Sequence, residues 1–489
     1  MKWWQKSSWQ LIITTALSLC LAFHYGVCTQ DDAFISFRYA ENWANGLGLV
    51  FNEGEYIEGF SNPSWTLLFG LGFLMHWDPV LLSLGLGYLS IAFLISATAH
   101  LLETFQIHSS LRWLPLLLVG VDPNMLLESV QGLESVFYAG LIAFALSYAL
   151  RENQHQRSHL FSTVLFALAT TTRPEAPLFF GLCHLALGLQ KSWNPLKWTK
   201  QGMPIFTILL WLLLQTSLRY WYYGDILPNT FYAKVGGTAF IRGLQYCWFH
   251  IQYHPVLWMG AVALLTSPKN HSSKNTVLWI ALGYLFYVMA IGGDFKPTSR
   301  FLLPVTPWFA VMLGDRLQAI PSQKYFKWLI AMLLSISFVS RWHLYQQTEF
   351  WAADRRGNLL ARKVIGDWLQ QNTPPETLIA MHSIGVVPYY AQRTCIDMWG
   401  LTDRYIAKTP NPDFGNGMAG HEKSNPHYVF SRHPDIYLPE DNIFQPEKVI
   451  QTVEKGFPAN FEEEYQPMNI KIKGSWLNFW IRKDFVKQL

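Results

Sequence analysis

Apolar residues in this chain gather in long runs that short polar stretches separate. A helix that crosses the hydrocarbon core of a bilayer needs about 20 mostly apolar residues. Runs of this kind fill much of the chain before residue 341, although several are too short to cross alone. The windows are residues 9–27, 62–77, 79–102, 111–131, 133–150, 159–172, 174–190, 203–221, 243–266, 276–292, 300–319 and 324–340. The pattern predicts an all-α polytopic membrane domain.

Basic residues in the polar connections predict the orientation of these windows. The connections at 151–157, 191–200, 267–274 and 321–327 are basic, and the positive-inside rule assigns them to the cytoplasm. The loops at 224–234 and 292–300, Asp31 and Asp32, and everything after residue 341 then lie outside. If the N-terminus is cytoplasmic and all twelve windows cross the membrane, the C-terminus would also lie in the cytoplasm, which contradicts this assignment. One element between Asn62 and Leu150 must therefore be re-entrant or merged, and we expect it near 111–121. The prediction is about 11 spans.

The periodicity changes before the second window and after the last one. Residues 33–45 place apolar side chains at helical spacing, which predicts a short amphipathic helix in the membrane interface. Residues 351–371 predict an amphipathic helix, and 377–381, 386–391 and 394–398 predict a strand, a helix and a strand. We expect a polytopic domain over 1–340, followed by a smaller soluble α/β or α+β domain over 341–489.

Composition narrows the class of protein. The 489 residues are 51% hydrophobic and only 14% charged, which excludes an ordinary soluble globule. The net charge of +4 comes from residues spread through short loops, so we expect no nucleic-acid partner. The five cysteines are scattered and match neither a disulfide framework nor a metal site. The first window lacks a small-residue cleavage site, so an uncleaved first span is favoured over a signal peptide.

Asp31 and Asp32 follow the first apolar window directly. Adjacent carboxylates at a membrane boundary are poorly placed for packing and well placed to accept a proton from a substrate hydroxyl. Two like charges this close are expected to raise the proton affinity of the pair. The alternative is a solvated acidic cluster. Spacing does not decide which aspartate is the base, because neighbours in sequence usually point apart.

Further charged and polar residues stand at the ends of apolar windows. In the loop at 292–300, Arg300 and Lys296 suit a phosphate clamp, against the alternative of an ordinary turn. Asn229 and Lys234 lie beside aromatic residues that suit sugar stacking or an aromatic belt. Arg173 and Glu175 form either a structural ion pair or part of a donor site. The candidate substrate-binding residues are Arg38, Glu58, Glu134, Arg173, Asn229, Lys234, Asp294, Lys296 and Arg300.

Metal binding is not predicted from the histidines of the last third. His382, His421, His427 and His433 match no zinc spacing, so we interpret them as surface residues and name no metal ligand.

Taken together, these segments resemble the GT-C superfamily of polytopic glycosyltransferases, and most closely the bacterial terminal arabinofuranosyltransferases. The resemblance rests on Asp31 to Leu68, with support from 131–135, 172–177, 224–234, 292–308, 396–407 and 420–423. In that superfamily an acidic residue of the first outer loop is the catalytic base, which here implies Asp31 and Asp32. The phosphate-clamp role is carried over to Arg300 and Lys234. The resemblance also implies a polyprenyl-phosphate-linked sugar as donor.

The predicted function is therefore that of a multi-pass glycosyltransferase of the bacterial inner membrane, with its active site and C-terminal domain in the periplasm. It would move a sugar from a polyprenyl-phosphate donor to a hydroxyl of an envelope glycan, lipid or protein. No nucleotide or other cofactor is implied, and a divalent cation beside the acids is left open. One alternative is a transporter or flippase that couples ions or protons through the acidic pair. Another is a non-catalytic scaffold.

Overall fold

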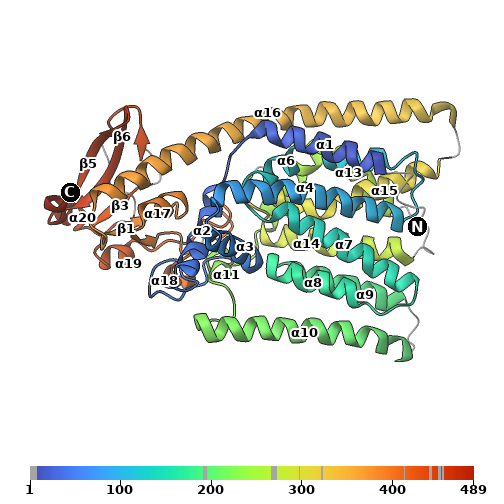
Figure 1. Cartoon of the computed structure of the whole chain (residues 1–489), viewed down its shortest axis with the longest axis horizontal. Helices are drawn as coiled ribbons and strands as arrows, with labels where there is room; N and C mark the ends of the chain where they lie inside the picture. The colour runs from blue at the N-terminus through green and yellow to red at the C-terminus, as the bar shows by residue number, and fades with distance from the viewer. Residues whose placement is uncertain are drawn as a thin grey trace.

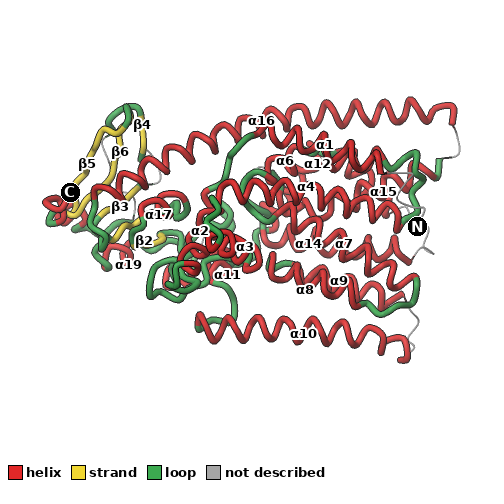
Figure 2. The backbone as a smooth tube through the Cα atoms, in the orientation of Figure 1, coloured by secondary structure: helices red, strands yellow, loops and turns green. Residues whose placement is uncertain are grey.

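The computed structural model describes residues 8–190, 195–265, 272–296, 298–320, 323–411, 414–439, 443–449, 453 and 456–489. The basic connections at 191–200, 267–274 and 321–327 and the loop at 292–300 thus fall partly outside the described residues. Helices fill one end of the molecule, and the strands gather at the other (Figures 1 and 2). Helix α1, the first described element, begins at the end of the molecule away from the strands, and the C-terminus lies at the strand-containing end (Figure 1).

The helical part begins with α1 and ends with the long helix α16. Its helices are α1 (Ser8–Tyr25), α2 (Asp31–Ala44), α3 (Pro63–Leu74), α4 (Pro79–Thr104), α5 (Trp113–Gly120), α6 (Pro123–Ser129), α7 (Ser135–Gln154), α8 (Leu160–Thr172), α9 (Ala176–Gln190), α10 (Pro195–Tyr223), α11 (Asn229–Lys234), α12 (Phe240–Tyr253), α13 (Pro255–Leu265), α14 (Ser272–Ile291), the 3-10 helix η1 (Arg300–Val305), α15 (Thr306–Gln318) and α16 (Gln323–Asn372).

Several of these helices are long and apolar enough to cross a membrane. Within the described residues, four reach a spanning length, namely 79–104, 202–223, 273–291 and 325–372. Shorter apolar helices cover 9–25, 63–74, 160–172, 176–189 and 255–265. Because so many apolar helices pack side by side, the chain is a multi-pass membrane protein. The count of about 11 spans stays a prediction.

Two of the apolar windows contain a break at a proline. Window 111–131 holds α5 and α6, of 8 and 7 residues, and Asp122 caps α6 just before Pro123. Window 243–266 is divided into α12 and α13 between His254 and Pro255. Helical geometry is disfavoured for the residue before a proline. Helices α5 and α12 therefore end shortly before Pro123 and Pro255. His254 Nε2 and Asp122 Oδ2 lie 2.7 Å apart, which joins the two breaks inside the bundle.

The helix α16 connects the two ends of the molecule. Its 50 residues extend over about 75 Å at 1.5 Å per residue, along the whole bundle and into the strand-containing end (Figure 1). The expected domain boundary at residue 340 lies inside this helix. We call residues 373–489 the C-terminal region.

The C-terminal region is built on a mixed sheet. Its strands are β1 (Leu378–Met381), β2 (Thr394–Asp397), β3 (Ile436–Leu438), β4 (Phe444–Gln445), β5 (Tyr465–Ile472) and β6 (Ser475–Arg482), and its helices are α17 (Val386–Ala391), α18 (Arg404–Lys408), α19 (Pro426–Ser431), α20 (Phe461–Glu464) and the 3-10 helix η2 (Phe485–Gln488). The strand order is β2-β1-β3-β6-β4, and β5 pairs with β6. Strands β1, β2 and β3 run parallel, and β6 is antiparallel to its neighbours. The predicted strand, helix and strand correspond to β1, α17 and β2.

The short helix α2 confirms the helical spacing at 33–45, but its surroundings differ from the expectation. Phe37 packs against Phe69 of α3, with ring centroids 4.6 Å apart, and Phe34 packs against Tyr389 of α17 at 5.4 Å. Residues 33–40 are all buried. The helix α2 is therefore packed between the helical part and the C-terminal region and does not lie in the membrane interface with one face in lipid.

Candidate functional site

A cavity of about 630 Å³ lies at the junction of the helical part and the C-terminal region. We call it the inner cavity. Its walls come from the start of α2, the loop before α3, the turn between α8 and α9, α11, the loop after α14, and segments near 401 and 420 of the C-terminal region. The acidic, basic and histidine residues that line it are Asp32, Glu134, Arg173, Glu175, Lys234, Arg242, Asp294, Arg300 and His421. The rest of the lining is mostly apolar.

The two aspartates that open α2 point to different partners. Successive residues of a helix are rotated by about 100°, so adjacent side chains diverge. The Asp31 carboxylate accepts hydrogen bonds from the backbone N–H groups of Gly385 and Val386, both at 2.9 Å, and pairs with Arg362 at 2.9 Å. Asp32 instead lines the inner cavity. The structure thus separates a carboxylate that joins α2 to α17 from a carboxylate that faces open space.

The approach of α17 to α2 depends on a glycine. A Cβ atom added at Gly385 would lie 1.9 Å from the carbonyl oxygen of Asp31. Only glycine therefore allows the N–H groups at the start of α17 to reach the Asp31 carboxylate.

Basic side chains determine the charge state of Asp32. Burial alone would raise the pKa of its carboxyl, but Lys296, Lys234 and Arg300 outweigh this and lower the pKa to about 2. The expectation that paired carboxylates raise each other's proton affinity is therefore wrong for Asp32. Asp31 is engaged elsewhere, and the charges that act most strongly on Asp32 are positive.

Lys296 lies behind the cavity wall. Its side chain is 3% exposed, and its Nζ has no hydrogen-bond partner among the described residues. Burial and the neighbouring Arg300 lower its pKa to about 8. Lys296 interacts electrostatically with Arg300 and Asp294, which form an ion pair, and it adds positive charge to this side of the cavity.

An ion triad forms another part of the wall. Arg173 pairs with Glu134 at 2.8 Å and with Glu175 at 2.6 Å. The second oxygen of Glu134 accepts a hydrogen bond from Asn62 Nδ2 at 2.7 Å. The triad joins the start of α7 to the turn between α8 and α9, and the Arg173 guanidinium lies over the Phe301 ring. Arg173 and Glu175 thus form a buried ion pair, and the same two residues line the inner cavity.

Four of the predicted substrate-binding residues lie outside the lining of the inner cavity, namely Lys296 and three residues that fasten distant segments. Arg38 donates to the backbone oxygens of Phe51, Pro388 and Arg393 at 2.8, 2.6 and 2.7 Å. Glu58 pairs with Arg219. The Asn229 amide donates to the carbonyl oxygens of Gly400 and Leu401 at 2.8 and 2.9 Å. Each of these three joins segments that are far apart in sequence, so their visible role is to hold the cavity walls together.

The lining also contains a histidine that was expected on the surface. The His421 ring packs against Trp399 and Phe295, with centroids 4.3 and 4.6 Å apart, and burial lowers its pKa. The expectation of a surface residue is therefore wrong for His421, whereas His427 and His433 are exposed. The signal that pointed to His421 was its place in the segment 420–423 of the family resemblance.

The residues around Asp32 do not fit a divalent cation. Within the described part of the chain, no three His, Cys, Asp or Glu side chains are grouped as metal ligands. Asp294 is already paired with Arg300, and the charges that act most strongly on Asp32 are basic. These basic side chains would repel a divalent cation placed beside Asp32.

Comparison with known proteins gives weak sequence similarity and extensive fold similarity. A family model described as "Domain of unknown function (DUF8728)" matches residues 346–480. Two proteins named terminal beta-(1->2)-arabinofuranosyltransferase are similar in sequence. The Mycobacterium tuberculosis protein is 25% identical over 44% of this chain and 36% of its own length, and the Corynebacterium glutamicum protein is 24% identical over 58% of this chain and 47% of its own length. The chain thus spans less than half the length of these curated relatives.

Solved structures match over a larger share of the chain. ArnT from Cupriavidus metallidurans bound to undecaprenyl phosphate has a TM-score of 0.60 at 12% identity, over 97% of this chain and 98% of its own. The Archaeoglobus fulgidus oligosaccharyltransferase in the apo form has a TM-score of 0.54 at 11% identity, over 81% of this chain and 65% of its own. The chain therefore has the GT-C fold of membrane glycosyltransferases, and its sequence resembles the terminal arabinofuranosyltransferases.

Proposed function

We propose that this protein is a membrane glycosyltransferase that takes a sugar from a polyprenyl-phosphate donor and transfers it to a hydroxyl of an envelope glycan, lipid or protein. One observation carries the proposal. The Asp32 carboxylate and the basic Lys234 and Arg300 line the same cavity, whose other walls are mostly apolar. A base and a phosphate-binding group that face one enclosed space are the parts that a phosphate-releasing sugar transfer requires.

The donor would enter with its phosphate toward Lys234 and Arg300. Phe231 and Val235, at the α11 side of the cavity, are each 43% exposed and offer an apolar path for a polyprenyl chain. ArnT, which shares the fold, was solved with undecaprenyl phosphate. As the bond between the sugar and the phosphate breaks, negative charge grows on the phosphate, and the two cations stabilise that charge.

Asp32 is assigned as the general base. The acceptor oxygen forms a bond to the anomeric carbon, the carbon–oxygen bond to the phosphate breaks, and the proton of the acceptor hydroxyl passes to Asp32. The lipid phosphate leaves with the bonding electron pair. A single displacement of this kind inverts the anomeric carbon, and no sugar becomes bound to the protein.

Donor binding would also prepare the base. A carboxylate with a pKa of about 2 is a weak base, and the pKa is this low because Lys296, Lys234 and Arg300 surround Asp32. A donor phosphate that pairs with the same cations offsets their effect and raises the pKa of Asp32. The carboxylate then accepts a proton more readily once the donor is in place.

The location of the reaction follows from the predicted orientation. The positive-inside rule assigns the loops that border the inner cavity, together with the C-terminal region, to the outer side. We therefore propose a site on the periplasmic side of a bacterial inner membrane, with the C-terminal region covering the approach of the acceptor.

Replacement of Asp32 by Asn tests the proposal. The protein is purified in detergent, supplied with lipid extract from the producing cells as donor and with an envelope fraction as acceptor, and sugar transfer is followed by mass spectrometry. Asp32→Asn should lower the transfer rate by about 10²–10⁴-fold, because a general base contributes this much. The matched control is Asp78→Asn. Asp78 is an exposed aspartate that caps α4, and Asn caps helices equally well.

Two results would count against the proposal. Transfer at the wild-type rate by Asp32→Asn would exclude Asp32 as the base. Solute uptake that needs a proton gradient and Asp32, without any sugar transfer, would favour the transporter instead.

A further inference from the structure

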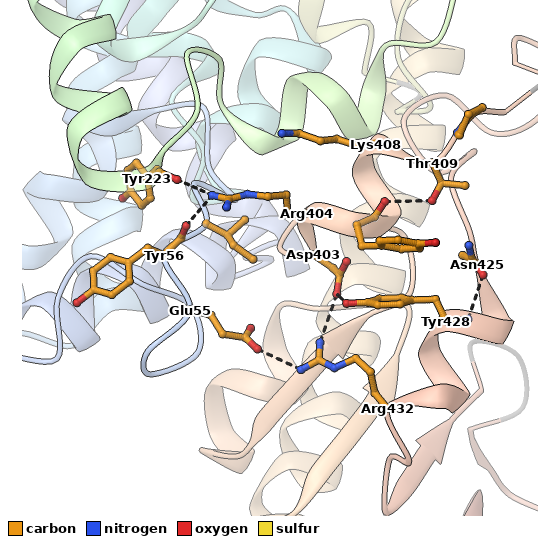
Figure 3. A pocket seen from close by; sticks show the side chains of 13 residues that line it. Glu55, Tyr56, Tyr223, Asp403, Arg404, Lys408, Thr409, Asn425, Tyr428 and Arg432 are labelled. Carbon is orange, nitrogen blue, oxygen red and sulfur yellow. Dashed lines mark hydrogen bonds and ion pairs between the residues drawn. The ribbon is translucent and has the colours of Figure 1, made fainter.

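A second cavity, of about 820 Å³, lies beside the inner cavity and is shown in Figure 3. We call it the outer cavity. Its walls come from the first loop after α2, the end of α10, α18 with the residues after it, and α19. Within the segment Gly400–Asp403, which we call the strap, Leu401 lines the inner cavity and Asp403 lines the outer one. Two residues span at most about 7 Å, so the cavities are close neighbours.

Aromatic rings form one wall of the outer cavity. Tyr405 stacks on Tyr428, with ring centroids 4.2 Å apart and planes at 22°. Tyr405 is nevertheless 56% exposed, and Tyr56 is 49% exposed. Burial of an aromatic side chain stabilises a protein, and these two exposed rings do not contribute that stabilisation. The electron-rich face of an aromatic ring attracts C–H groups that carry partial positive charge, and the C–H faces of sugar rings provide such groups.

Charged side chains with fixed partners form the rest of the lining. Arg432 contacts Glu55 at 3.2 Å and Asp403 at 3.4 Å, and the Tyr428 hydroxyl donates to Asp403 at 3.3 Å (Figure 3). These contacts link the first loop to the C-terminal region. Because the partners hold each group in place, little side-chain freedom is lost when a ligand binds.

A second set of ionic contacts fixes the opposite wall. Arg404 pairs with Asp225 at 3.0 Å and donates to the backbone oxygen of Tyr56 at 3.0 Å, and Lys408 pairs with Asp225 at 2.7 Å. The charged groups of the outer cavity thus have both signs and neutralise one another locally. Such a lining offers many donors and acceptors without a strong field of either sign.

We propose that the outer cavity binds the glycan chain of the acceptor and presents its end to the inner cavity. The inference rests on the proposed function and narrows the acceptor to a carbohydrate. Hydroxyl groups of a sugar exchange hydrogen bonds with Asp403, Arg432 and Glu55 while the sugar face stacks on Tyr405. A lipid acyl chain does not fit, because five charged side chains would lose hydration against it.

The test replaces the exposed ring. Tyr405→Ala removes the stacking face, and Tyr405→Phe keeps the face and removes only the hydroxyl. Tyr220→Ala is the matched control, because Tyr220 is 61% exposed on α10 and lines neither cavity. The full chain in detergent receives donor lipid extract and, as acceptor, the envelope glycan fraction from cells that lack the protein.

The expected result is a selective loss of acceptor affinity. Tyr405→Ala should raise the KM for the glycan fraction about five- to tenfold and leave the KM for the donor lipid unchanged. Tyr405→Phe and Tyr220→Ala should keep the wild-type KM. An unchanged glycan KM in Tyr405→Ala would overturn the inference, as would transfer by the wild type to protein or lipid and not to glycan. If the wild type neither transfers nor hydrolyses the donor sugar, the proposed function itself fails.

Discussion

The sharpest prediction concerns the different fates of Asp31 and Asp32 when each is changed to Asn. Asp31 accepts two backbone N–H groups and pairs with Arg362, and its side chain is 13% exposed. The side-chain amide of Asn keeps one oxygen that can accept a hydrogen bond. Its NH₂ group would face the second backbone N–H, which would then lose its acceptor. Hydrogen bonds to charged groups contribute about 1.5–3 kcal/mol each. The Asp31→Asn change should therefore weaken the docking of α17 on α2 by about 2–4 kcal/mol.

Hydrogen–deuterium exchange of the segment 382–391 measures this docking directly. A loss of about 2–4 kcal/mol in local opening free energy corresponds to exchange that is roughly 30- to 900-fold faster. In Asp32→Asn the same amides should exchange at nearly the wild-type rate, while sugar transfer falls about 10²–10⁴-fold. Asp31→Asn should retain transfer to within about tenfold, because its carboxylate does not line the inner cavity.

The opposite pattern would contradict the separate roles of Asp31 and Asp32. If Asp31→Asn abolished transfer while the exchange of 382–391 stayed slow, Asp31 would have a chemical role. If Asp32→Asn loosened α17 as strongly as Asp31→Asn does, the division of labour between the two carboxylates would be wrong.

Three further changes test the surroundings of the site. Because the pKa of Lys296 is about 8, its ammonium loses its charge as the pH rises past this value. The KM for the donor should therefore rise about tenfold between pH 7 and 9.5, and the pH profile of Lys296→Met should lack this rise. Glu134→Gln leaves the buried Arg173 with one carboxylate, so the free energy of unfolding should fall by about 3 kcal/mol, read as a lower thermal midpoint in detergent. Asn229→Ala removes the hydrogen bonds to Gly400 and Leu401, so proteolysis of the strap should speed up, corresponding to a loss of about 1–3 kcal/mol.

The parts of the fold that local periodicity encodes could be predicted. The apolar runs became helices, and the segments at 377–381, 386–391 and 394–398 became β1, α17 and β2, because each pattern lies within a single element. The strands β3 to β6 were not predicted. β3 and β4 have 3 and 2 residues, too few to display a period, and their pairing with β6 depends on contacts distant in sequence.

The same limit applies to the site. Asp32, Lys234 and Arg300 stand out in the sequence because charged residues at the ends of apolar runs are costly, and all three line the inner cavity. Arg38 was also named as a candidate, yet it donates to backbone oxygens, and two of these belong to residues about 350 positions away in the sequence. No spacing rule distinguishes a charge that faces a cavity from one that fastens two distant segments. The low pKa of Asp32 was likewise hidden in the sequence, because the cations that cause it come from α11 and from the loop at 292–300, both far from Asp32 along the chain.

The inner cavity depends on the C-terminal region for its shape as well as its lining. Leu401 and His421 belong to its wall, Asn229 fixes the strap from the helical side, and the start of α17 fixes α2 through Asp31. Asp32 therefore faces the inner cavity only when the two parts of the chain are docked. With the proposed donor bound, undocking would admit water beside its sugar–phosphate bond, and hydrolysis would then compete with transfer. It follows that a variant that loosens this docking, such as Asp31→Asn, should raise the ratio of donor hydrolysis to transfer before it lowers the total turnover.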